Sequence, residues 1–427
     1  MKSSKLLFIL RISVCAAFIS AAAPSEDWPN WRGPDNNGVS DEKGVTATWS
    51  ATENVKWRLA LPGTSPATPA IAKDHIFFTS LEDGQLYLYA VSTEGKQLWK
   101  KHLGKAKTNF RIPESHSGSP SPNTDGKHVW IFTGTGTLAC FDFSGNEIWK
   151  IDVQEKYGAF RMYHGMSTST LLDGDRLYLA LMHDNAQAVI AFEAKTGKEI
   201  WNHKRATKAV MENLHSYASP IMYEYNDEKY LLTHGSDVIS AHSLKDGSEL
   251  WRSGGLQYPD NYNNFLRFVA TPVTSNGLII APSAKAGPVL AIKPKKGARG
   301  DITHDESQFV WKLNAGSTDV PSPVIHDGLV YMVRHDGILV CIDAESGEEV
   351  YKESVYRRRH RASPVIADGK LYMQATDGVV NVIKTGQRYE LLATNKIEEQ
   401  MYSSLAIVDG VIYLRTFDAL YAIQENQ

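Results

Sequence analysis

Residues 322–351 read SPVIHDGLVYMVRHDGILVCIDAESGEEVY, and the pattern in this stretch recurs along the 427-residue chain. Short runs of Val, Ile, Leu and Tyr alternate with turn sequences of the type Asp-Gly or Ser-Gly. Such runs are typical of antiparallel strands joined by tight hairpins, because glycine accepts the positive φ that these turns need. The stretch therefore predicts one four-stranded antiparallel meander.

A tryptophan follows a turn glycine by four residues at several places in the chain. Four of these tryptophans are 50, 52 and 50 residues apart. The pairs are Gly95 with Trp99, Gly145 with Trp149, Gly197 with Trp201, and Gly247 with Trp251; Gly347 with Tyr351 repeats the pairing, and Trp311 belongs to the series with extra residues after Gly297. Self-similarity at such a period predicts a β-propeller, in which each repeat is one blade.

Seven repeats are complete, and an eighth begins at Ser403 but ends before its fourth strand. Residues 54–59 resemble an isolated fourth strand, with Trp57 in the docking position and no three strands before it. Lending this strand to the last repeat would close the ring and remove an exposed sheet edge. The prediction is an all-β, eight-bladed propeller over residues 54–423; the alternative is a seven-bladed ring with a frayed end.

The N-terminus has the features of a secretory signal peptide. Two lysines precede an apolar run, and small residues lead to Pro24. A membrane anchor is the alternative, but Arg11 interrupts a run already shorter than the roughly 20 apolar residues of a spanning helix. We expect residues 1–23 to be removed, residues 24–53 to form an N-terminal extension, and the protein to be periplasmic or secreted.

The net charge of the chain argues against some classes of partner, and the positions of its cysteines argue against a disulfide. Removal of residues 1–23 takes away three positive charges and no negative ones, so the formal charge of −3 becomes −6. An acidic protein has no overall attraction to nucleic acid or anionic lipid, and the basic run 357–361 lacks interleaved aromatics. Cys140 and Cys341 fall in third strands four blades apart, so we expect two free thiols.

A family resemblance rests on the docking repeat. Residues 191–201, AFEAKTGKEIW, are similar to the tryptophan-docking motif of quinoprotein dehydrogenases, Ala-x-Asp-x-x-Thr-Gly-x-x-x-Trp, with Glu193 in place of Asp. Residues 341–347 and 241–251 are looser copies. The chain also resembles a wider group of propellers that are similar to those that bind pyrroloquinoline quinone (PQQ). This group includes BamB. Residues 28–34 resemble the N-terminal signature of its exported bacterial members.

The resemblance implies a structural role for the tryptophans. Each ring offers a flat surface to the neighbouring blade and an N–H that needs a partner when buried. The predicted docking residues are Trp57, Trp99, Trp149, Trp201, Trp251 and Trp311.

Two functions remain open. One is a PQQ-dependent dehydrogenase, which as a family carries adjacent paired cysteines, calcium ligands and an Asp base. This chain has no adjacent cysteines and no Cys-x-x-Cys-His haem motif, and we predict no catalytic residue, no metal site and no cofactor. The primary prediction is a non-catalytic binding scaffold, because propellers present loops and a central funnel on a rigid frame. Its partner would be a protein, or an anionic small molecule or glycan.

The funnel hypothesis concerns residues just before the innermost strands. The position five residues before the second member of each Ser-Pro-like pair is basic in several repeats: His164, His215, Arg267 and Arg359, with His116, His360, Arg361 and Tyr402 nearby. Convergent cationic donors would bind an anion, more tightly at low pH where histidines are protonated. The alternative is that these groups are solvated, or satisfied by acids such as Asp319 and Glu399.

Overall fold

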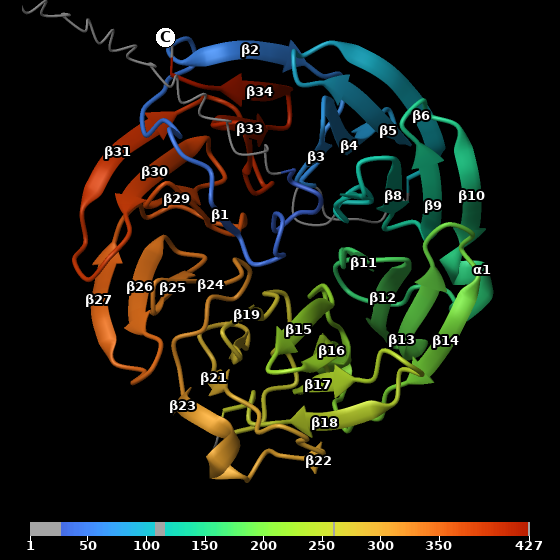
Figure 1. Cartoon of the computed structure of the whole chain (residues 1–427), viewed down its shortest axis with the longest axis vertical. Coiled ribbons are helices and arrows are strands. Elements are labelled where there is room, and N and C mark those ends of the chain that lie inside the picture. Colours follow the sequence, from blue (N-terminus) through green and yellow to red (C-terminus); the bar gives the residue numbers. More distant parts are fainter. Residues whose placement is uncertain (1–26, 107–115, 259–260, 426–427) are drawn as a thin grey trace, which may run out of the picture.

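Eight β-sheets stand around a central axis in the computed structural model, which describes residues 27–106, 116–258 and 261–425 (Figure 1). Six sheets have four strands, and two carry a fifth, short parallel strand. This arrangement confirms the predicted eight-bladed propeller. The predicted signal peptide, residues 1–23, lies outside the described residues. Within them, no helix is long and apolar enough to cross a membrane.

The first four blades follow the chain in order. They contain β3 (Ala70–Ala72), β4 (His75–Glu82), β5 (Gln85–Ser92) and β6 (Gln97–Lys105); β7 (Asn123–Thr124), β8 (His128–Phe132), β9 (Thr137–Asp142) and β10 (Glu147–Asp152); β11 (Leu171–Asp173), β12 (Arg176–His183), β13 (Ala186–Glu193) and β14 (Glu199–Lys204); and β15 (Ile221–Tyr225), β16 (Glu228–Gly235), β17 (Val238–His242) and β18 (Glu249–Ser253). Short helices lie between strands: α1 (Val153–Tyr157) and the 3₁₀ helices η1 (Met211–Leu214) and η2 (Glu306–Gln308).

The other four blades complete the circle. They contain β19 (Val273–Ser275), β20 (Leu278–Pro282), β21 (Val289–Ile292) and β23 (Phe309–Leu313); β24 (Val324–His326), β25 (Leu329–Val333), β26 (Ile338–Asp343) and β27 (Glu349–Ser354); β28 (Val365–Ala367), β29 (Lys370–Gln374), β30 (Val379–Lys384) and β31 (Leu391–Lys396); and β32 (Ala406–Val408), β33 (Val411–Arg415) and β34 (Ala419–Ile423) with β2 (Val55–Ala60). The extra parallel strands are β1 (Val39–Ser40) on β28 and β22 (Gly300–Asp301) on β18.

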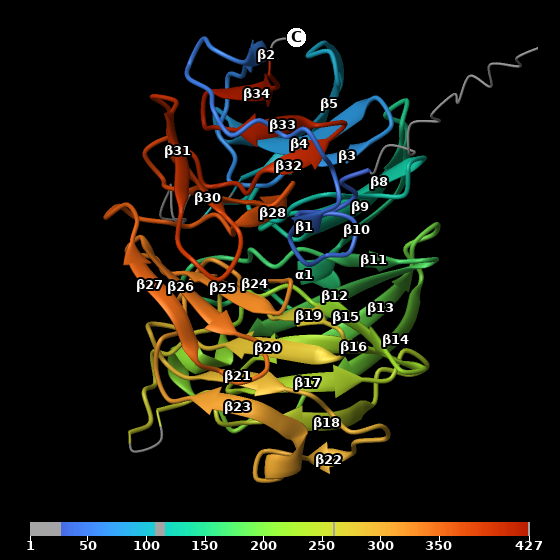
Figure 2. The same ribbon diagram turned by 60° about the vertical axis from the view of Figure 1, so that its left-hand side comes forward.

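The ring closes through β2. This strand pairs antiparallel with β34, in a register that runs from Val55 opposite Ile423 to Ala60 opposite Ala419. Figures 1 and 2 show the two strands side by side, although they come from opposite ends of the chain. The last blade is therefore built from both ends, which confirms the predicted closure.

The apolar core lies between neighbouring blades. Side chains of a strand alternate between the two faces of its sheet, and here both faces of the inner strands are covered by adjacent sheets. Accordingly β20 is buried at all five positions, whereas the outer strand β2 alternates between half-buried and exposed residues. Burial of both faces explains why the inner strands are continuous apolar runs.

The predicted docking tryptophans join one blade to the next. Five indole N–H groups donate to a backbone carbonyl in the following blade, at 2.8–3.1 Å: Trp57 to Thr93, Trp99 to Phe143, Trp149 to Ala194, Trp201 to Leu244, and Trp311 to Ala344. Each of these rings also lies against the turn glycine of that blade. A Cβ on Gly95, Gly145, Gly197, Gly247 or Gly347 would come within 2.9 Å of a ring atom.

Trp251 is buried but differs from the other five. The next blade carries an insertion between β21 and β23 that contains β22, and the backbone of Trp251 pairs with Gly300 of that strand. Its ring stands edge-on to Tyr230, with the ring centroids 5.9 Å apart. Nothing lies within 4 Å of a Cβ built on Gly297, so Trp251 does not dock on the equivalent glycine. The insertion covers it instead.

Residues 27–53 run across one face of the ring (Figure 1). Trp28 is fully buried and exchanges backbone hydrogen bonds with Ile71 of β3. Arg32 is buried beneath the same face and donates to the carbonyls of Asn37 and Pro323, at 2.7 and 2.6 Å. Burial lowers the pKa of Arg32 to about 9, but the guanidinium remains charged at neutral pH. The segment thus ties blade one to blades six and seven.

Candidate functional site

A ring of hydroxyl groups surrounds the central axis. Each blade contributes one Ser or Thr just before its innermost strand, and its backbone N–H donates to the hydroxyl oxygen of the residue from the next blade, at 2.9–3.0 Å. The members, in order, are Thr68, Ser121, Ser169, Ser219, Thr271, Ser322, Ser363 and Ser404, and Ser404 donates back to Thr68. We call these residues the hydroxyl belt. All eight residues line the channel, and a hydroxyl that accepts a bond keeps its own proton to donate.

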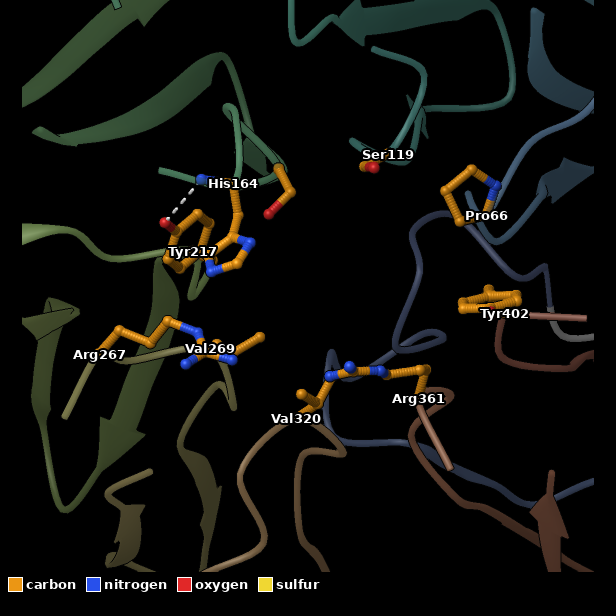
Figure 3. Close-up of a pocket in the computed structure, with 10 residues that line it drawn as sticks. Pro66, Ser119, His164, Tyr217, Arg267, Val269, Val320, Arg361 and Tyr402 are labelled. Carbon is orange, nitrogen blue, oxygen red and sulfur yellow. Dashed lines mark hydrogen bonds between the residues drawn. The ribbon is translucent and has the colours of Figure 1, made fainter. Parts of the chain in front are cut away.

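One end of this channel opens into a pocket of about 170 Å³. The pocket is lined by Pro66, Ser119, His164, Ser167, Tyr217, Arg267, Val269, Val320, Arg361 and Tyr402. Figure 3 shows the side chains of Arg267 and Arg361 extending into it from opposite sides. At the other end of the channel, Trp31 of the N-terminal segment lies beside the hydroxyl belt. We call the open end the central pocket.

Four of the eight predicted funnel residues meet in the central pocket: His164, Arg267, Arg361 and Tyr402. They come from the loops that lead into the innermost strands, as the repeat alignment predicts. Tyr402 stacks on Phe417, with the ring centroids 5.1 Å apart, and this contact orients its ring. The hydroxyl of Tyr217 accepts the backbone N–H of His164 at 3.3 Å.

Two of the predicted histidines are buried away from the central pocket. His116 contacts the Thr64 hydroxyl at 3.0 Å and accepts the backbone N–H of Gly118. His360 donates through Nδ1 to the carbonyl of Arg358, at 2.9 Å. Burial lowers the pKa of both histidines to about 4, and Arg415 adds to the effect at His116. Both rings are therefore neutral in mildly acidic solution and cannot supply the expected charge.

The other two predicted residues also lie outside the central pocket. His215 is buried, and its Nε2 lies 2.8 Å from a carboxylate oxygen of Asp184. Arg359 is exposed and lines an outer groove with His335 and Arg357. Position in the repeat predicted which loops reach the mouth, but not which side chains point inward.

A carboxylate that the sequence did not reveal stands behind the pocket. Glu212, in η1, lies 3.4 Å from Nε2 of His164 and 3.6 Å from Nε of Arg267. Burial opposes its ionisation, but the neighbouring His164 and Arg267 outweigh burial and lower the pKa of Glu212. Acids therefore do lie against predicted funnel residues, but they are Glu212 and Asp184. Glu399, which was expected in this role, pairs with Arg58 at 2.8 Å.

The lining of the central pocket does not fit the calcium ion of the quinoprotein dehydrogenases. Calcium is held by carboxylate and carbonyl oxygens, whereas the pocket lining contains two guanidinium groups and no carboxylate. Among the described residues, no group of three or more His, Cys, Asp or Glu side chains is arranged to hold a metal ion. Cys140 and Cys341 are both buried and free, in β9 and β26 of opposite blades.

A family model described as outer membrane protein assembly factor BamB matches residues 87–353 and 298–389. Together the two matches extend over well more than half of the chain. The chain belongs to the BamB family. This result confirms the resemblance that the tryptophan-docking motif indicated.

Two of the curated relatives that match illustrate the low identity. BamB of Yersinia pestis is 21% identical over 248 residues, which are 55% of this chain and 56% of the relative. Tetrathionate hydrolase of Acidithiobacillus ferrooxidans is 22% identical over 311 residues, which are 68% of this chain and 54% of the relative. The chain thus spans about half the length of these relatives.

Solved structures share the fold of this BamB-family chain. BamB from Moraxella catarrhalis superposes with a TM-score of 0.61 at 14% identity, over 87% of this chain and 97% of that one. A europium-containing methanol dehydrogenase superposes with a TM-score of 0.68 at 10% identity, over 92% of this chain and 90% of that one. At these identities the likeness shows the fold alone.

Proposed function

We propose that the chain is a non-catalytic scaffold, exported to the periplasm or beyond, that binds a protein partner through the loops around the central pocket. The signal-like residues 1–23 support export. The BamB relatives support assembly with other proteins, because their name describes a factor in outer membrane protein assembly.

The observation that carries the proposal is a set of exposed apolar residues in neighbouring loops, two of which also carry the pocket residues His164 and Arg267. Its members are Tyr163, Val210, Met211, Tyr262 and Phe265, each between 46% and 58% exposed. They lie in the three loops that lead into blades three, four and five. Large apolar side chains that neighbouring loops leave exposed to solvent are candidates for a protein interaction site. We call these five residues the mouth cluster.

Contacts between the loops hold the mouth cluster in place. The side chain of Asn213 donates to the carbonyl of Asn263 at 2.9 Å, and Lys285 donates to the carbonyl of Phe265 at 2.6 Å. The backbone N–H of Tyr163 donates to Nδ1 of His215 at 3.4 Å. Residues braced in this way lose little further freedom on binding, which favours association.

Site-specific photo-crosslinking in the native host tests the proposal. We expect a photo-reactive phenylalanine analogue at Phe265 to capture one defined protein, and the capture to be lost when Met211→Asp is added. Ile148, an apolar residue on the outer strand β10 that is 45% exposed, is the matched control and should capture nothing. Equal capture from both positions, or capture that Met211→Asp leaves unchanged, would refute binding by the mouth cluster.

A further inference from the structure

We propose that the central pocket recognises an oxyanion, of the carboxylate or sulfate class, between Arg267 and Arg361. Figure 3 shows these two side chains approaching from blades five and seven, on opposite sides of the cavity. Two facing guanidinium groups can each form parallel N–H bonds with oxygens of one ligand, the strongest type of hydrogen bond that proteins make to anions.

The remaining lining favours an anion over a cation or a neutral apolar molecule. Ser119, Ser167 and Tyr217 bring hydroxyl groups to the pocket wall. Burial raises the pKa of Tyr217, so its phenol remains protonated. No acidic side chain lines the cavity. Val269 and Val320 cover part of the wall and reduce competition from water, which strengthens charge-assisted bonds.

Arg267 lies against Glu212, but this contact does not use all the hydrogen-bond donors of its guanidinium group. Its side chain is 15% exposed, and it meets Glu212 through Nε at 3.6 Å. Among the described residues, no side chain or carbonyl accepts a hydrogen bond from its two terminal nitrogens, which are the atoms best suited to hold a ligand oxygen. Glu212 lies behind the arginine and lowers the net positive charge of the site.

This arrangement predicts effects of opposite sign at neighbouring residues. Removing a guanidinium removes ligand bonds, so Arg267→Gln and Arg361→Gln should each weaken anion binding about tenfold or more. Removing the charge of Glu212 leaves the positive potential unopposed, so Glu212→Gln should strengthen binding several-fold. A loss of folding cannot produce tighter binding, which keeps the test informative.

The experiment is titration calorimetry of the purified full chain with sodium sulfate and with disodium succinate at fixed ionic strength. Arg359→Gln is the matched control, because it removes the same charge two residues from Arg361 but outside the central pocket. We expect its affinity to equal that of the unmodified chain. Weakening by Arg359→Gln equal to that by Arg361→Gln would overturn the proposal.

A second arm distinguishes a free ion from an acidic side chain of a docked partner. A short peptide that carries one Glu is titrated beside its Gln counterpart. Sulfate or succinate binding indicates a free ligand; binding of the Glu peptide alone indicates a side chain inserted by a partner, and either supports oxyanion recognition. If neither salt nor the Glu peptide binds at millimolar concentration, the proposal fails, while the crosslinking test of the mouth cluster is unaffected.

Discussion

Individual turn glycines hold the blades together by leaving room for an indole ring. Gly197 has φ of +70°, and a Cβ there would lie 2.6 Å from a ring atom of Trp149. Gly174 has a similar φ of +59°, but nothing lies within 4 Å of its Cβ position. Substituting Ala at Gly174 therefore tests the free-energy cost of the backbone conformation alone. Substituting Ala at Gly197 adds the cost of a steric clash with the indole ring.

We predict that Gly174→Ala lowers the free energy of unfolding by about 1 kcal/mol, the usual penalty of a left-handed non-glycine residue. Gly197→Ala should lower it by a further 1–3 kcal/mol, roughly the cost of overpacking, because the Trp149 ring must move. Urea denaturation followed by tryptophan fluorescence measures both values. Equal losses in the two variants would show that the indole contact carries no energy.

At the level of single residues, the sequence predicted some site residues but not others. Counting from the Ser-Pro pair brought His164 and Arg267 to the pocket correctly, because repeats place equivalent backbone positions at equal heights. It also selected Arg359, whereas Arg361 lines the cavity. The direction of a loop side chain depends on local φ and ψ, which a repeat alignment does not contain. Glu212 follows Met211, whose φ is +56°, in a turn that no repeat predicts.

Among the elements, β2 has the largest role for its size. It supplies the outer strand of blade eight and carries Trp57, which donates to Thr93 of blade one at 2.8 Å. Without it, β34 would expose unpaired backbone groups and an apolar edge. Closure thus depends on a strand of six residues.

We predict that a chain lacking residues 50–60 unfolds at much lower urea concentration and aggregates, and that a synthetic peptide of residues 50–63 added during refolding restores the native transition. The peptide can pair with β34 as β2 does, which satisfies the open edge. Refolding yield and light scattering report the rescue. A peptide of the same composition in scrambled order is the control, and equal rescue by both peptides would contradict closure by strand pairing.

The N-terminal segment of residues 27–53 was not predicted from the repeat. The strands of every blade followed from repeated apolar runs and turns, and the missing fourth strand of the eighth blade followed from the count of repeats. Residues 27–53 have no counterpart in the repeat, so their path across the ring was not predicted. The buried Trp28 and Arg32 show that this extension is part of the packed structure, since removal of either would leave a cavity or unsatisfied carbonyls.

At the scale of the whole molecule, the two described cysteines can serve as probes of unfolding on opposite sides of the ring. Cys140 lies in blade two and Cys341 in blade six, and both are fully buried. Burial raises the pKa of Cys140 to about 12 and that of Cys341 to about 11. Because the thiolate is the reactive form, neither should react while its blade is intact.

We predict that iodoacetamide at pH 8 labels neither cysteine in the folded protein, and that both become labelled at the same urea concentration. A closed ring leaves no free end from which one blade can open first. Mass spectrometry of the peptides resolves the two sites, and Ser144→Cys on an exposed turn provides a rapidly labelled control. Labelling of one site at distinctly lower urea would mean that the ring opens locally.

The shared last blade also has a consequence for the order of events during synthesis. Residues 55–60 leave the ribosome long before their partner strand, residues 419–423, has been made. Until these two strands meet, the propeller is an open arc with two unsatisfied ends. Long-range pairing of this kind is slow, and a waiting strand is prone to pair with other chains. The first strand must therefore stay unpaired until residues 419–423 are available to it.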